Sequence, residues 1–348
     1  MQFFSAQFGF AFLNFLNSFV NMKFFKTKLT QGAVVIAACM LSTQLLFTSC
    51  TSRQTTENRT QEISKTTAAG TDRSFLLEHF STAKGVGAAS GLVFKNQKIY
   101  IISDDSDVLY QYSIHDLKTA KISLRKDGAL TEHRPKKEKS DFEAITFHNG
   151  FHVFGSGSGI NRKQLVTISE NGETTTFHSL EKLYTDCKKV AGISDEDFNI
   201  EGAAIHKDDL LLFNRGNGPA RKNGIFRIRK WNKPNKSQPV FHPVSLPEIG
   251  DTVFGFTDAL LLDGKIVFLA AAEAVASTYL DGEVLGSMIG TINPDDYSLG
   301  KTEIISTEHK FEGLTHFSSD QKKHTFLLCE DPDNGNKETV IYSLKISR

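Results

Sequence analysis

The sequence predicts an all-β fold for residues 74–348, and specifically a five-bladed β-propeller. Short runs of Val, Ile, Leu, Phe and Tyr alternate there with clusters of Asp, Asn, Gly and Ser, without a long stretch of helical periodicity. Five related segments recur at intervals of 53 to 58 residues, and further strand-like runs follow each one. A propeller of six blades with one degenerate unit is the alternative, and a two-sheet sandwich is the third choice.

Before this domain, residues 1–50 have the layout of a secretory signal. They contain no Asp, Glu or Arg, and an apolar run at 32–47 follows the charged segment. The only charges are those of Lys23, Lys26 and Lys28. Met22 stands directly before these lysines, so we favour it as the start of translation over Met1.

The apolar run ends at Cys50, which is preceded by Thr-Ser and followed by a polar stretch, as in a relaxed bacterial lipobox. This pattern predicts cleavage before Cys50 and attachment of lipid to its thiol. We therefore expect an exported protein of the bacterial cell envelope, anchored by lipid to the membrane and most simply to the outer membrane. An uncleaved anchor and a free secreted form are the alternatives, although about 15 apolar residues are short for a span.

Residues 51–73 are polar and rich in Thr, which predicts a disordered tether between the anchor and the propeller. Two cysteines remain in the domain, Cys187 and Cys329. Their wide separation favours two unpaired thiols over a disulfide, although an exported protein permits one.

The blades follow from the order of hydrophobic runs. Each repeat begins with an inner strand, whose starts are Ser90, Glu143, Glu201, Asp258 and Glu312. Second strands are expected at 98–103, 151–155, 209–214, 265–270 and 324–329, and third strands at 108–113, 164–169, 224–229, 288–292 and 339–345. Four repeats add a fourth strand, at 121–125, 174–179, 239–246 and 302–306. The fifth repeat lacks one, and Phe75–Phe80 would supply it and close the ring.

Composition excludes several classes of protein. The chain has 348 residues with 40 basic and 40 acidic side chains, so its formal net charge is zero. This balance gives no electrostatic footprint for nucleic acid. With 26 Gly and only 8 Pro, the chain is neither collagen-like nor wholly disordered.

The starts of the inner strands predict an acidic site on the propeller axis. Because inner strands line the central channel, the acidic members of the series would converge there; they are Glu143, Glu201, Asp258 and Glu312. Converging carboxylates repel one another unless a cation lies among them, so we expect a metal site, with calcium as the candidate ion. The alternative is that they accept backbone N–H bonds or pair with arginines.

Loops after the second strands should lie on the same rim and carry function. Arg162 and Arg215 stand close to glycines and could approach an anionic group, or could instead neutralise the channel carboxylates. The other candidates on this rim are Asp104, Glu273, Tyr279 and Asp281. Asp104–Asp107 matches a calcium loop only weakly, and the basic run 133–139 is either an anion-recruiting or a solvated segment.

The motif series carries a family resemblance. Ser-Gly-Leu at 90–92, Asp-Phe-Glu-Ala-Ile at 141–145, Asn-Ile-Glu-Gly-Ala-Ala at 199–204, Phe-Thr-Asp-Ala at 256–259 and Phe-Glu-Gly-Leu at 311–314 resemble the phytase-like esterases and related calcium-binding propellers. Within these, the series is most similar to a group of bacterial lipoproteins of unassigned function. The resemblance implies a central acidic metal site and hydrolysis of a phosphate or carboxylate ester.

Two functions follow as expectations. In the first, calcium held by the four carboxylates activates water, Arg162, Arg215 and Glu273 are catalytic, and Asp104, Tyr279 and Asp281 bind a small anionic ester. In the second, the rim binds a glycan, peptide or protein without catalysis. No Gly-x-Ser-x-Gly elbow or His-Glu-x-x-His motif supports a serine hydrolase or a zinc peptidase.

Overall fold

The computed structural model describes residues 74–231, 237–274, 282–331 and 335–348, and all structural statements below refer to these. They form five four-stranded antiparallel sheets. Blade 1 contains β2 (Ala89–Lys95), β3 (Lys98–Ser103), β4 (Val108–Ser113) and β5 (Thr119–Ser123). Blade 2 contains β6 (Phe142–Phe147), β7 (Phe151–Gly155), β8 (Gln164–Ile168) and β9 (Thr175–Ser179).

The remaining blades have the same plan. Blade 3 contains β10 (Ile200–His206), β11 (Asp209–Asn214), β12 (Gly224–Arg229) and β13 (Pro239–Pro243). Blade 4 contains β16 (Gly255–Leu262), β17 (Lys265–Glu273), β18 (Val284–Ile292) and β19 (Leu299–Ser306). Blade 5 contains β20 (Phe311–Ser319), β21 (Lys323–Glu330), β22 (Glu338–Ser347) and β1 (Phe75–Lys84). A short hairpin of β14 (Glu248–Ile249) and β15 (Thr252–Val253) precedes blade 4.

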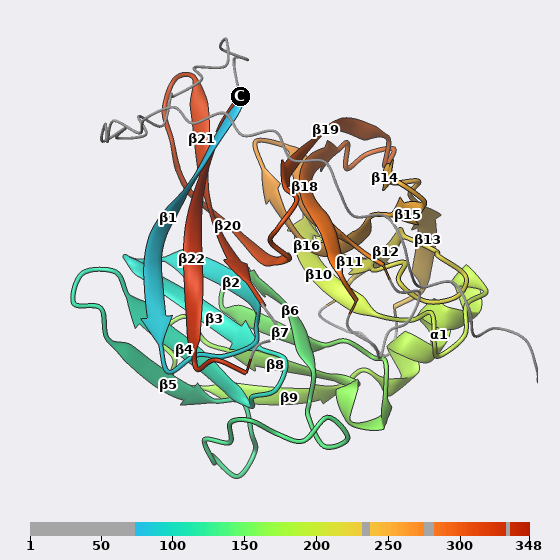
Figure 1. The fold of residues 1–348 in the computed structure, drawn as a ribbon. Coiled ribbons are helices and arrows are strands. Elements are labelled where there is room, and N and C mark those ends of the chain that lie inside the picture. Colours follow the sequence, from blue (N-terminus) through green and yellow to red (C-terminus); the bar gives the residue numbers. More distant parts are fainter. Residues whose placement is uncertain (1–73, 232–236, 275–281, 332–334) are drawn as a thin grey trace, which may run out of the picture. The chain divides into compact units, whose positions relative to one another are not determined.

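The five blades form a closed propeller, which confirms the predicted fold class. Inner strands contact one another in the cyclic order β2, β6, β10, β16, β20. The N-terminal strand β1 pairs antiparallel with β22, from Phe75 opposite Ile346 to Lys84 opposite Glu338, with a register shift between His79 and Ser81. Figure 1 shows β1 in blue alongside β22 in red, so strands from the two ends of the domain complete one blade as predicted.

Buried hydrophobic side chains fill the spaces between neighbouring blades rather than one central core. Five clusters of the described residues lie at the five blade interfaces. Between blades 3 and 4, for example, the rings of Phe213 and Phe256 meet edge to face with centroids 5.4 Å apart. Each such ring contributes about 1.5–3 kcal/mol by burial, so the blade interfaces stabilise the ring and leave the axis to polar side chains.

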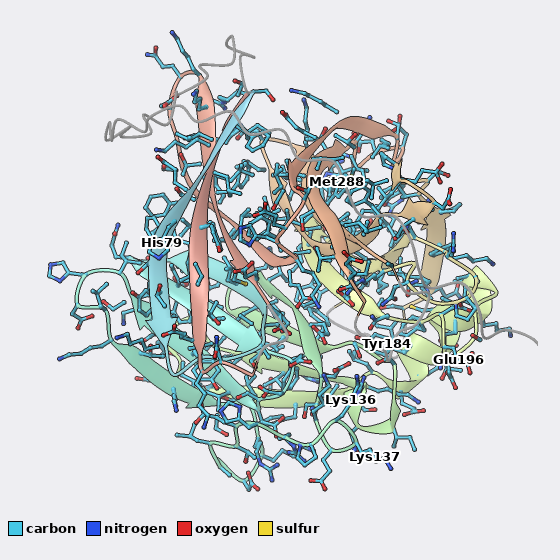
Figure 2. All side chains as sticks on the ribbon, viewed as in Figure 1. His79, Lys136, Lys137, Tyr184, Glu196 and Met288 are labelled. Carbon is cyan, nitrogen blue, oxygen red and sulfur yellow. The ribbon has the colours of Figure 1, made fainter. Side chains whose placement is uncertain are left out.

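One helix, α1 (Glu181–Ala191), was not predicted and corrects the expectation that helical periodicity is absent. Leu183, Tyr184 and Cys187 form its buried face, against the cluster between blades 2 and 3. The buried Tyr184, labelled in Figure 2, donates a hydrogen bond of 2.7 Å from its hydroxyl to the carbonyl of Gly155. The helix ends at Gly192, whose left-handed φ of 60° suits a glycine.

The two domain cysteines are free, as predicted, and both are buried. Cys187 lies in α1 and Cys329 in β21. Over the described part of the chain, no helix is long and apolar enough to cross a membrane. Cys50, the signal region and the tether lie outside the described residues.

Candidate functional site

Each inner strand has a β-bulge near its start, and the bulged residue defines an equivalent position in the five blades. The register shift falls between residues 89 and 91, 142 and 144, 200 and 202, 256 and 258, and 311 and 313. The bulged residues are therefore Ser90, Glu143, Glu201, Thr257 and Glu312. A bulge redirects a side chain out of the pleated surface, so the sequence repeat marks a real structural position.

The structure corrects the repeat in blade 4. Thr257 occupies the bulge, and Asp258 lies one residue beyond it, where the other blades carry Gly or Ala. The buried carboxylate of Asp258 accepts backbone N–H bonds of 2.7 Å each from Ala259 and from Leu314 of blade 5. Burial nevertheless raises its pKa well above the usual range. Asp258 thus fits the alternative of a carboxylate bonded to backbone.

The hydroxyl groups at the two bulges without a carboxylate join neighbouring blades. Ser90 donates a hydrogen bond of 2.5 Å to the carbonyl of Phe142, which directly precedes Glu143. Thr257 donates one of 2.8 Å to the carbonyl of Phe311, which directly precedes Glu312. These bonds fix the backbone next to two of the bulged glutamates.

The first set of charged residues, the Glu143 group, consists of Asp104, Lys139, Asp141, Glu143 and Arg162. Lys139 bonds to Asp104 and lies 2.8 Å from Asp141 Oδ1. Arg162 donates to Asp141 Oδ2 over 2.7 Å and to the carbonyl of Lys136 over 3.0 Å. None of the described residues forms a hydrogen bond or an ion pair with Glu143. Glu143 is therefore the carboxylate of this group without a direct ion-pair partner, and Lys139 attracts it only at longer range.

The carboxylates of the Glu143 group lie close enough to share a cation. Asp104, Asp141 and Glu143 can each offer one oxygen, and these atoms lie within 4.8 Å of one another. Burial raises the pKa of Glu143 well above its usual range, and the neighbouring Asp141, Asp104 and Glu201 raise it further. By contrast, Lys139 and Arg162 hold the pKa of Asp141 below its usual value despite burial. Burial also raises the pKa of Asp104, although Lys139 lowers it, so the ionised forms of both Glu143 and Asp104 are disfavoured in this group.

The second set, the Arg215 group, consists of Glu201, Arg215, Glu273, Lys310 and Glu312. Arg215 Nη1 lies 3.0 Å from both oxygens of Glu201, and Nη2 lies 2.9 Å from Glu273. Lys310 lies 3.3 Å from Glu273 and 3.2 Å from Glu312. All five side chains are at most 10% exposed, and every carboxylate has a cationic partner. This arrangement matches the alternative in which arginine neutralises the channel.

The acidic and basic runs of the blade 1 and blade 2 loops pair with each other. Asp107 bonds to Arg134, and Asp105 lies 3.0 Å from His133 Nδ1. The insertion at 133–139, in which Figure 2 labels Lys136 and Lys137, therefore contacts Asp104, Asp105 and Asp107 of the acidic run. Asp105 and Asp107 are thus engaged by the insertion, which does not fit a calcium loop formed by the whole run, whereas Asp104 also faces Asp141 and Glu143.

The structure thus divides the predicted site residues between two groups. Glu201, Arg215, Glu273 and Glu312 meet in one, and Asp104, Glu143 and Arg162 in the other. Tyr279 and Asp281 lie outside the described residues. Sequence reasoning missed Lys139, Asp141 and Lys310. Two of these, Asp141 and Lys310, stand two residues before a bulged glutamate, and that spacing was a usable signal.

These features define a five-bladed propeller with a charged polar axis. The family model DUF6929, a family of unknown function, matches residues 85–346, so the chain belongs to that family. No curated protein matches the sequence.

The chain is also distantly similar to solved structures. A nidogen–laminin complex is 10% identical, with 71% of this chain and 75% of that chain covered and a TM-score of 0.39. The PQQ-bound aldose sugar dehydrogenase of Streptomyces coelicolor is 9% identical, with coverages of 78% and 98% and a TM-score of 0.38. An exo-1,5-α-L-arabinanase from a bovine ruminal metagenomic library is 11% identical, with coverages of 77% and 98% and a TM-score of 0.43. Likenesses this distant carry no argument about activity.

Proposed function

We propose that this chain is an exported, lipid-anchored propeller that binds a divalent cation at Asp104, Asp141 and Glu143. The observation that carries the proposal is the carboxylate of Glu143, which has no direct ion-pair partner among the described residues and lies close to two other carboxylates. Hard oxygen donors suit Ca²⁺ or Mg²⁺, which complete their shells with water. If all are ionised, the ten side chains of the two groups carry six negative and four positive charges, and one divalent ion would balance them.

The arrangement supports binding more than catalysis. Both candidate catalytic arginines are held by carboxylates, Arg162 by Asp141 and Arg215 by Glu201 and Glu273. A guanidinium whose donors are engaged in this way is poorly placed to stabilise charge that develops on a substrate. The resemblance to phytase-like esterases points to ester hydrolysis, so the test includes it as an outcome.

Calcium titration followed by thermal melting tests the proposal. A ligand that binds only the folded state stabilises it by about 2.7 kcal/mol when its concentration is about 100 times its Kd. We expect calcium to raise the melting temperature of the wild type, and chelator to reverse the effect. Glu143→Gln should lose this response because it removes the ligand without a direct ion-pair partner.

Glu312→Gln is the matched control, since it alters the bulged glutamate of the Arg215 group. It should lower the starting stability and still respond to calcium. An equal calcium response in Glu143→Gln, or none in the wild type, would contradict the proposed site. If the protein hydrolyses p-nitrophenyl phosphate or p-nitrophenyl acetate in a calcium-dependent way, and Glu143→Gln abolishes this activity, the site is catalytic and the proposal of binding without catalysis is wrong.

The proposed lipid anchor is tested separately in bacterial cells. Wild-type chain grown with alkyne-labelled palmitate should incorporate label and partition with membranes, whereas Cys50→Ala should do neither. Cys187→Ala is the control because that thiol is buried in α1. Labelling that survives in Cys50→Ala would disprove the lipobox interpretation.

A further inference from the structure

A serine, a histidine and an aspartate meet between blades 4 and 5, at the end of the inner strands opposite the bulges. Ser319 is the last residue of β20, whose bulge is at Glu312. Ser319 Oγ lies 2.7 Å from His324 Nδ1, and His324 Nε2 lies 3.7 Å from Oδ2 of Asp263 in the β16–β17 hairpin. Ser319 is exposed, so a ligand can reach its hydroxyl group.

The strand register of blade 5 explains why these side chains face blade 4. Ser319 pairs opposite His324, and His324 pairs opposite Ile346, so the three side chains lie on one face of the sheet. Phe326, two residues after His324, shares this face and packs in the cluster that contains Val267 of blade 4. The hydroxyl and the imidazole are therefore directed toward the neighbouring blade, which supplies the aspartate.

The contacts of His324 suit a general base. Burial lowers the pKa of its imidazole, which favours the neutral ring. With the ring proton on Nε2, facing Asp263, Nδ1 accepts the hydroxyl proton of Ser319. His316 Nε2 also lies 2.7 Å from Ser319 Oγ and donates to it in this arrangement. Arg348 bonds to Asp263 and holds the carboxylate beside the imidazole.

His324 and Asp263 also line a cavity between the two blades. Its volume is about 460 Å³, within the range of small-molecule sites, roughly 300–1,000 Å³. The apolar side chains of the lining come from both blades and are Leu262, Val267, Ile289, Phe326 and Ile346. Lys265, also in the lining, has no hydrogen-bond or ion-pair partner among the described residues. The cavity thus offers apolar space and an available cation next to a serine–histidine pair.

We infer that Ser319 is the nucleophile of a site that hydrolyses esters of apolar carboxylic acids. Ser319 Oγ attacks the carbonyl carbon while its proton passes to His324 Nδ1, and that proton then moves to the departing alcohol. Water next attacks the acyl-serine, gives a proton to His324 that returns to Ser319 Oγ, and releases the carboxylic acid. Lys265 offers its ammonium group to the negative charge that develops on the carbonyl oxygen. This site needs no metal and does not rest on the proposed cation site.

The first test is labelling of the full chain with a fluorophosphonate, which reacts with activated serines, in the presence of chelator. Peptide mass spectrometry should place the adduct on Ser319, and Ser319→Ala should carry none. Ser318→Ala is the matched control and should label as the wild type does, because Ser318 pairs opposite Thr325 and points to the other face of the sheet. No adduct on the wild type, or an equal amount on Ser319→Ala, would overturn the inference.

The second test is hydrolysis of p-nitrophenyl butyrate by the full chain in chelator. Ser319→Ala and His324→Ala should each lower kcat by about 100-fold or more. Ser319→Ala should keep the wild-type melting temperature, since Ser319 is exposed. The butyrate should have a kcat/KM about tenfold above that of p-nitrophenyl acetate, because the cavity buries its two additional methylenes. The inference is wrong if hydrolysis is absent, requires calcium, or persists in His324→Ala, and equal values for the two esters would contradict the apolar substrate class.

Asp263 is a positioning residue, because it acts through His324. Asp263→Asn should lower kcat about tenfold or more with KM unchanged, and Asp263→Glu should recover most of the activity. A purely structural role would lower the melting temperature and leave kcat of the folded protein unchanged. That result would remove Asp263 from the site.

Discussion

The Glu143 group and the Arg215 group have the same charge composition and opposite outcomes. Each contains three carboxylates, one arginine and one lysine. In the Arg215 group the guanidinium reaches all three glutamates, with distances from 2.9 to 3.9 Å. In the Glu143 group both cations bond to the aspartates, and Glu143 is left without a partner among the described residues.

The difference follows from where the loops place each cation. Arg162 also donates to the carbonyl of Lys136 and to Ser158, so the insertion before β6 holds it away from Glu143. Lys310 stands only two residues before the bulged Glu312 and reaches it directly. Equal numbers of charges therefore do not make equal sites. The geometry decides whether a carboxylate is neutralised internally or is available to a ligand.

Removing the arginine of each group should give the largest and most unequal effects. Arg215→Met leaves Glu201 with no cation within ion-pair distance among the described residues, and should lower the free energy of unfolding by about 3–5 kcal/mol. Arg162→Met leaves Asp141 its bond to Lys139, so its cost should be about 1.5–3 kcal/mol. Urea unfolding in chelator measures both. Equal costs would mean that the two groups are compensated alike.

Replacing the glutamates should give changes of opposite sign in chelator. Glu201→Gln removes the negative charge and one of the two oxygens that accept from Arg215, and should cost about 1.5–3 kcal/mol. Glu143→Gln removes a charge without a direct ion-pair partner and should raise the melting temperature by roughly 2–4 °C, equivalent to ~1 kcal/mol. Glu248→Gln, in the exposed hairpin, should change neither value. A loss of stability in Glu143→Gln would show that its carboxylate is already paired in solution.

The sequence predicts the blades well because strand periodicity and turn residues are local signals. The second strands of blades 1, 2 and 3 match the expected bounds, and the closing strand begins at Phe75 as expected. Blade 4 was misaligned by one residue because Asp258 matched the acidic series better than Thr257. Aligning the apolar residue before each bulge, Phe256 in this blade, would have corrected the register.

The pairing within the site was not predictable from local patterns. Lys139 belongs to an insertion whose path depends on its contacts with Asp104 and Asp141. Arg215 contacts Glu273, which is 58 residues away in the sequence. The sequence identified the carboxylates and the arginines, and only the tertiary arrangement shows which of them neutralise one another.

The pH dependence of stability should distinguish Asp258 from Asp141, because burial raises the pKa of Asp258 whereas Lys139 and Arg162 hold the pKa of Asp141 below its usual value. The protonated form of Asp258 is therefore favoured in the folded state. The contribution of Asp258 to the free energy of unfolding is fully present below its unfolded pKa, near 3.9, and is lost as pH rises through its folded pKa. Between these two pKa values, stability falls by at most about 1.4 kcal/mol per pH unit. Asp258→Asn cannot ionise, so its free energy of unfolding relative to wild type should rise with pH in urea titrations. If the difference in free energy of unfolding between Asp258→Asn and the wild type stays constant from about pH 4 to about pH 8, the pKa of Asp258 is not raised in the folded state.

The smallest expected effects concern the hydroxyls at the bulges without a carboxylate. Thr257→Val keeps the shape of the side chain and removes its bond to the carbonyl of Phe311, at a cost of about 1 kcal/mol. Ser90→Ala should cost a similar amount, because it removes the equivalent bond to Phe142. Thr257→Ser retains the hydroxyl and should stay near wild-type stability in urea unfolding. If Thr257→Ser is as unstable as Thr257→Val, the methyl packing rather than the bond between blades holds the backbone beside Glu312.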